Sequence, residues 1–96
     1  MAMSLERARA RVWISGRVQG VNFRAHTRDQ ARRINVEGWV RNLKDGRVEA
    51  IFEGNRAAVQ RMVSWCYSGP SSAQIEHVDV EWEEVTNREG PFSIVW

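Results

Sequence analysis

The run of residues 16–24, GRVQGVNFR, contains the residue types of an anion-binding loop. Two glycines can adopt φ > 0 without a steric penalty, so successive backbone amides can curl into a concave nest. A helix that starts directly after such a loop adds the partial positive charge of its N-terminus. Arg24 would lie in the first turn of that helix, where its planar guanidinium matches phosphate or carboxylate oxygens. The spacing therefore predicts a small site for a phosphate-like anion.

The same spacing also fits an ordinary turn between a strand and a helix. Glycine is common in such turns, and an arginine early in a helix often only faces solvent. Spacing alone leaves both interpretations open.

Two separate motifs resemble the signatures of acylphosphatases. The first follows the pattern G-x-V-Q-G-V-x-F-R, with matches at Gly16, Val18, Gln19, Gly20, Val21, Phe23 and Arg24. The second is similar to G-W-V-x-N and consists of Gly38, Trp39, Val40, Arg41 and Asn42. Both occur in the order and at the separation typical of the family, and the resemblance covers residues 9–96. One departure from some members is Leu43, where a hydroxyl residue can occur, and it affects only a secondary polar contact near the site.

The resemblance implies roles for the site residues and a reaction. Arg24 would bind the phosphate and Asn42 would orient the attacking water, as the two catalytic residues. The implied reaction splits the carboxyl–phosphate bond of small acyl phosphates into a carboxylate and inorganic phosphate, which would inhibit as a product. The phosphate-binding loop would comprise Gly16, Arg17, Val18, Gln19, Gly20, Val21, Asn22 and Phe23.

The residues near the loop narrow the reaction independently. No Asp or Glu lies between Arg7 and Arg28, so the carboxylates of a metal-dependent phosphatase are missing there. No cysteine precedes Arg24 as a thiolate nucleophile. Without a general acid, the leaving group must depart unaided, which a carboxylate with a pKa of about 4 can do and an alkoxide cannot. We therefore expect in-line attack by water, with no metal, cofactor or covalent intermediate.

The hydrophobic pattern predicts the elements that would position these residues. Alternating apolar residues indicate strands at residues 9–15, 37–43, 47–53, 74–85 and 92–96, with helices at 23–34 and from 56 to 68. Asp45-Gly46 predicts a hairpin, Asn35 a left-handed helix end and Asn55 a helix cap. This order predicts an α+β fold, a ferredoxin-like βαββαβ sandwich. Its sheet would be mainly antiparallel, with both helices on one face and an extra C-terminal edge strand.

Length and composition indicate one globular domain. The chain has 96 residues, 43% apolar and 27% charged, and no apolar run approaches the ~20 residues that cross a membrane. We expect a disordered tail at residues 1–6 and a single domain at 7–96. The lone Cys66 excludes an internal disulfide or a CxxC site and fits the core. We expect a cytoplasmic monomer with no membrane partner.

Charge is distributed unevenly along the chain. Residues 1–47 carry eleven Arg or Lys against four Asp or Glu, and residues 48–96 carry three against eight. The basic half holds both motifs and could attract a small anionic substrate. Alternatively, its arginines are simply solvated faces of a strand and a helix.

Two other functions share features of this sequence. RNA-recognition domains have the same βαββαβ order, but their third strand carries stacking aromatics, whereas residues 47–53 here contain two acids and one phenylalanine. We therefore expect no nucleic-acid partner. A non-catalytic acyl-phosphate binder remains open.

We expect His26 at the surface, His77 in a cross-strand pair, and Trp39 and Trp96 as packing or sheet-face residues.

Overall fold

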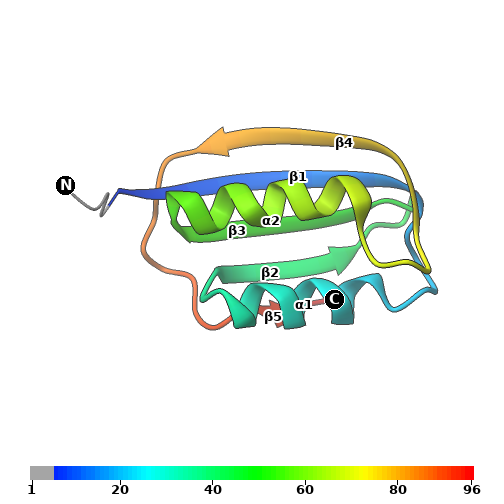
Figure 1. Cartoon of the computed structure of the whole chain (residues 1–96), viewed down its shortest axis with the longest axis horizontal. Coiled ribbons are helices and arrows are strands. Elements are labelled where there is room, and N and C mark those ends of the chain that lie inside the picture. The colour runs from blue at the N-terminus through cyan, green and yellow to red at the C-terminus, as the bar shows by residue number, and fades with distance from the viewer. Residues whose placement is uncertain (1–5) are drawn as a thin grey trace.

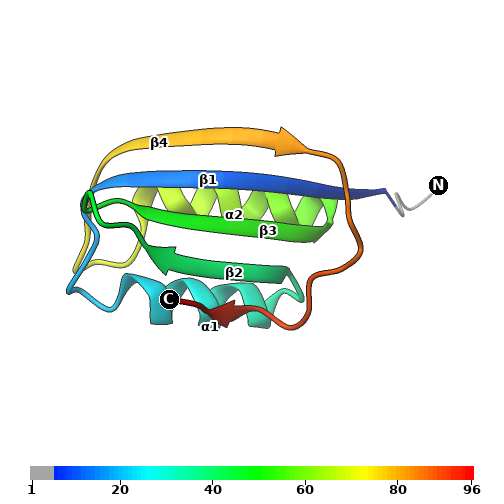
Figure 2. The same ribbon diagram turned by 180° about the vertical axis from the view of Figure 1, so that it is seen from behind.

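The computed structural model describes residues 6–96. Its elements are β1 (Arg7–Arg17), α1 (Phe23–Arg33), β2 (Glu37–Asn42), β3 (Val48–Asn55), α2 (Arg56–Ser68), β4 (Gln74–Glu83) and β5 (Ser93–Ile94). The strands form one sheet in the order β4-β1-β3-β2-β5. Only β5 pairs in parallel, with β2. Both helices cover the same face (Figure 1), and neither lies over the opposite face (Figure 2). The predicted ferredoxin-like sandwich with a C-terminal edge strand is confirmed.

The core lies between the sheet and the helices. Alternate side chains of β1 point into it because successive residues of a strand face opposite sides. Fully buried residues come from β1 (Ala10, Val12, Ile14), β3 (Val48, Ala50, Phe52), α1 (Phe23, Ala31) and α2 (Val59, Met62, Cys66). In the described part of the chain, no helix is long and apolar enough to span a membrane.

The open face of the sheet carries an ion-pair network. Arg9 binds Glu53 at 2.9 Å, Glu83 at 3.0 Å and Glu89 at 2.8 Å. Burial by itself would raise the pKa of Glu53, but hydrogen bonds from Arg9 and from the backbone amides of Asn87 and Thr86 hold it below its ordinary value. The network therefore keeps a fully buried carboxylate ionised.

Trp39 lies on this open face, as expected for a sheet-face residue. The guanidinium carbon atoms of Arg11 and Arg41 lie 5.9 Å and 5.2 Å from its ring centroid. His77 lies opposite Ser15 of β1 in the strand register, as predicted for a cross-strand pair, while its ring nitrogen contacts Asp79 of its own strand at 2.9 Å.

The predicted boundaries of β1 were too narrow. Gly16 and Arg17 belong to the strand and not to the loop, since they pair with Ile75 and Gln74 of β4. The register shifts between Ser15 and Gly16, and a Cβ atom on Gly16 would lie 2.2 Å from the carbonyl oxygen of Gln74. Gly16 therefore permits the close approach of two strands.

Other element ends also differ from the prediction. Asn35 is left-handed, with φ 60°, as predicted, but α1 ends at Arg33. The strand β4 ends at Glu83, and β5 has only two residues because just two pair with β2. Asn55 caps α2 as predicted, since its side chain accepts a hydrogen bond from the Ala57 amide.

Most of the predicted disordered tail, residues 1–5, lies outside the described residues. Glu6 is described, and its carbonyl accepts a hydrogen bond from the Arg56 amide.

Candidate active site

The loop between β1 and α1 turns with two left-handed residues. Gly20 has φ 77° and Asn22 has φ 61°. Asn22 occupies the position before α1, but its side chain caps no amide there, and the first turn of α1 contains no acidic residue. The positive end of the helix is thus not neutralised by its own side chains, which leaves it suited to an anion.

Gln19 fixes the loop to the β2–β3 hairpin. Its side-chain nitrogen donates hydrogen bonds to the carbonyl oxygens of Leu43 at 2.8 Å and Arg47 at 2.9 Å. On the other side, Ser72 donates a hydrogen bond to the Val21 carbonyl at 3.0 Å. The backbone position of Leu43, and not its side chain, therefore supports the loop.

A pocket of about 250 Å³ opens where this loop, the start of α1 and the end of β2 meet. The structure brings Arg24 and Asn42 to this one pocket, although they lie on different elements. Four residues of the predicted loop also line it, whereas Gly16, Arg17, Gln19 and Val21 do not. The lining residues are Val18, Gly20, Asn22, Phe23, Arg24, Ala25, Asn42, Ile94 and Trp96.

Two buried polar atoms in this pocket have no hydrogen-bond partner among the described residues. They are Nη1 of Arg24 and Oδ1 of Asn42. Buried polar atoms are nearly always paired, so an unpaired one needs an explanation. The guanidinium nitrogen is a charged donor that suits an anionic oxygen, and the amide oxygen is a neutral acceptor that suits the O–H of a water. The pair has the polarity needed to hold an anion beside a water.

Sequence reasoning missed the contribution of the C-terminal segment. Ile94 and Trp96 line the pocket, and the ring centroid of Trp96 lies 4.4 Å from the guanidinium carbon of Arg24. The expectation that Trp96 is a packing or sheet-face residue was wrong. Its place depends on the parallel pairing of β5 with β2, which a short apolar run after Gly90-Pro91 does not reveal.

Comparison with known proteins decides the family. The family model described as Acylphosphatase matches residues 10–94. The chain belongs to the acylphosphatase family. An acylphosphatase of Chloroflexus aurantiacus is 67% identical over 92 residues, which cover 96% of this chain and 100% of that protein.

Solved structures agree with this assignment. The crystal structure of an acylphosphatase from Bacillus subtilis superimposes with a TM-score of 0.88 at 34% identity, covering 93% of this chain and 99% of that one. An acylphosphatase from Coxiella burnetii has a TM-score of 0.87 at 32% identity, with 93% of each chain covered. The fold and the sequence relationship thus extend over nearly all of this chain.

The remaining candidate groups of the enzyme lie elsewhere. His26 is exposed and does not line the pocket. Burial raises the pKa of the Cys66 thiol to about 12, so Cys66 is an unreactive core residue. Within residues 6–96, no group of three or more His, Cys, Asp or Glu is placed to hold a metal ion.

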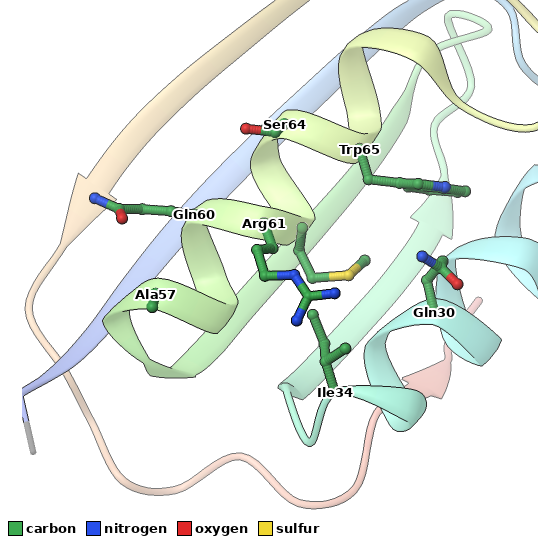
Figure 3. Close-up of a pocket in the computed structure, with 8 residues that line it drawn as sticks. Gln30, Ile34, Ala57, Gln60, Arg61, Ser64 and Trp65 are labelled. Carbon is green, nitrogen blue, oxygen red and sulfur yellow. The ribbon is translucent and has the colours of Figure 1, made fainter. Parts of the chain in front are cut away.

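A larger hollow of about 520 Å³ lies between the two helices. Figure 3 shows it between the α1 side, where Gln30 of the helix and Ile34 directly after it line the hollow, and α2, which contributes Arg61 and Trp65. Neither catalytic candidate borders it. This groove is therefore separate from the pocket that holds Arg24 and Asn42.

Proposed function

We propose that the enzyme hydrolyses the carboxyl–phosphate bond of small acyl phosphates by in-line attack of a water. The observation that carries this proposal is the pairing of a charged donor on Arg24 with a neutral acceptor on Asn42 in one pocket. Phosphoryl transfer depends on positioning and charge stabilisation more than on covalent chemistry. A site with these two groups supplies both.

Arg24 and the loop bind the phosphoryl group in this proposal. The guanidinium donates to non-bridging oxygens, and backbone amides from Gln19 to Phe23 surround the others. The first turn of α1 carries no carboxylate that would compete for the same donors. Negative charge that develops on these oxygens is stabilised by donors already in place.

Asn42 holds the nucleophile in this proposal. Its amide oxygen accepts a hydrogen bond from the water and thereby directs a lone pair of that water toward phosphorus. A side-chain amide is not a base near neutral pH, so Asn42 orients the water without removing a proton from it. Fixed orientation of the reacting atoms is itself a large contribution to rate.

The leaving group must depart without an acid in this pocket. Arg24 is the one ionisable side chain among the nine lining residues, and a guanidinium does not give up its proton. A carboxylate with a pKa of about 4 leaves as a stable anion, whereas an alkoxide needs protonation. The pocket therefore favours acyl phosphates over phosphate monoesters.

Turnover in isotopically labelled water tests this mechanism. We expect the enzyme to hydrolyse benzoyl phosphate and acetyl phosphate, to place the heavy oxygen in inorganic phosphate, and to leave glycerol phosphate intact. EDTA should not change the rate, because we propose no metal. Label in the carboxylate would instead mean attack at the carbonyl carbon, and binding without turnover would identify a non-catalytic acyl-phosphate binder.

We further propose that the enzyme works as a cytoplasmic monomer inhibited by its product phosphate. The three large apolar side chains exposed on the described surface, Tyr67, Trp82 and Trp96, belong to different parts of the fold. The buried free thiol of Cys66 suits a reducing compartment. Light scattering that gives the mass of two chains would contradict the monomer.

A further inference from the structure

Trp96 is the most exposed large apolar side chain described, and yet it borders the active-site pocket. Its exposed fraction is 92%, compared with 59% for Tyr67 and 48% for Trp82. An indole that stays exposed to water does not stabilise the fold through the hydrophobic effect. The ring therefore contributes little to core packing, and its contact inside the pocket is the feature that distinguishes it.

That contact is a cation–π contact with Arg24. The guanidinium carbon lies 4.4 Å from the centroid of the Trp96 ring, closer than in the other three such pairs described. Arg24 forms no ion pair with a carboxylate anywhere in residues 6–96. A cation–π contact uses the face of the aromatic ring, and a guanidinium that stacks parallel to this face keeps its N–H donors free at its own edge. The contact can therefore fix the guanidinium plane and leave Nη1 available.

Backbone pairing places Trp96 at this position. Ile94 pairs in parallel with Val40, and the Val95 amide donates a hydrogen bond to the Val40 carbonyl at 2.9 Å. Two residues further along each strand, β2 reaches Asn42 and the chain after β5 reaches Trp96. Both views show this end of the chain beside α1, which carries Arg24 (Figures 1 and 2). The position of the indole is thus set by the sheet.

We propose that Trp96 is a positioning residue, whose indole holds the Arg24 guanidinium in the plane that binds the phosphoryl group. This inference rests on the proposed role of Arg24. Trp96 acts on the phosphate end of the substrate, which every acyl phosphate shares. Loss of the indole should therefore weaken the binding of all acyl phosphates and of inorganic phosphate to a similar degree.

Three substitutions test the proposal: Trp96→Leu removes the π face, Trp96→Phe keeps an aromatic face, and Trp82→Leu is a control on an exposed tryptophan outside the pocket. The measurements are kcat and KM for benzoyl and acetyl phosphate and the inhibition constant of phosphate. For Trp96→Leu, we expect the inhibition constant to rise about two- to fivefold and kcat/KM to fall by a similar factor for both substrates. Trp96→Phe should recover most of this loss, and Trp82→Leu should match the wild type.

Several outcomes would overturn the proposal. A folded Trp96→Leu enzyme with the wild-type inhibition constant would show that Arg24 needs no such contact. A loss confined to benzoyl phosphate would place Trp96 against the acyl group, and an equal loss in Trp96→Phe would show that the aromatic face is unimportant. Failure of the proposed function would look different, because the wild-type enzyme would then turn over neither substrate. Circular dichroism at the assay temperature establishes that each variant is folded.

Discussion

Arg24 has a shape that lysine cannot replace. A guanidinium donates two parallel hydrogen bonds to a phosphate, whereas an ammonium is a point charge. For Arg24→Lys we expect kcat/KM to fall roughly a hundred- to thousandfold, the equivalent of about 2.7–4 kcal/mol of transition-state stabilisation. The free energy of unfolding should barely change, because Nη1 has no hydrogen-bond partner in the described structure. Steady-state kinetics and urea unfolding measure the two quantities.

Arg28 offers the control for this substitution. It lies one turn further along α1 and binds the exposed Asp29 at 3.1 Å, away from the pocket. Arg28→Lys should therefore retain wild-type kinetics. Equal activity in Arg24→Lys and Arg28→Lys would refute the assignment of Arg24.

Asn42 should affect the rate more than the affinity for phosphate. An amide that contacts the attacking water, and not the bound anion, acts mainly in the transition state. We expect Asn42→Ala to lower kcat strongly while phosphate still inhibits at a similar concentration. Asn42→Asp, in contrast, should weaken phosphate inhibition, because it places a negative charge beside the anion. An Asn42→Ala enzyme that folds and keeps its kcat would mean that another group holds the water.

Among the elements, the loop before α1 depends on the backbone conformation of Gly20. A Cβ atom there would meet nothing within 4 Å, but φ is 77°, a conformation that β-branched residues avoid. We expect phosphate to raise the melting temperature of the wild-type enzyme, and we expect Gly20→Val to fold with a displaced loop and to lose this rise. Thermal unfolding with and without phosphate measures this change.

Gly46 provides a matched control in the β2–β3 hairpin. Its φ is 98°, a Cβ atom there would also meet nothing within 4 Å, and it does not line the pocket. Gly46→Val should lose stability from similar strain and yet keep its response to phosphate. If Gly20→Val also kept that response, the loop would not be the anion site.

Local patterns predicted most elements, and long-range contacts explain the errors. Alternation in β1, the Asp45-Gly46 hairpin and the Asn55 cap are decided by neighbouring residues, so the sequence shows them directly. We predicted Gly16 in the loop because the sequence does not show why a glycine is needed. The structure shows that a side chain at this position would collide with the carbonyl oxygen of Gln74, which is distant in sequence. Trp96 was missed for the same reason, since its neighbours are set by the pairing of Ile94 with Val40. The two sequence motifs predicted that Arg24 and Asn42 share one site. Only the structure shows that each has a buried polar atom without a hydrogen-bond partner among the described residues.

At the scale of the whole molecule, the network on the open face ties stability to pH. Hydrogen bonds from Arg11 and Arg9 lower the pKa of Glu83, and those from Arg9, Asn87 and Thr86 hold that of Glu53 below its ordinary 4.5 against the effect of burial. A carboxylate whose pKa is lower in the folded state stabilises the fold above its unfolded pKa. That contribution disappears as the pH falls through the folded pKa. We therefore expect the free energy of unfolding to fall with pH below about 4.5.

Glu53→Gln tests the network. Removal of one partner leaves Arg9 buried with less compensation, so the free energy of unfolding near neutral pH should drop by about 3–5 kcal/mol. Urea unfolding at several pH values should also show a smaller acid dependence than the wild type. Asp79→Asn is the control, because Asp79 is exposed and, within residues 6–96, its carboxylate forms an ion pair only with His77. A Glu53→Gln enzyme with the wild-type pH dependence would show that Glu53 does not carry this effect.

The pairing of β1 with β4 also governs how the chain folds. Arg9 and Glu83 stand 74 residues apart in sequence and meet across these two strands. Contacts of such wide separation require the closure of long loops before they stabilise anything, so they slow the search for the native state. Ile94 and Trp96 line one side of the active-site pocket, and their position depends on the pairing of β5 with β2. After dilution from urea, catalytic activity should therefore return in the slowest refolding phase, together with the last sheet pairings and later than helix formation.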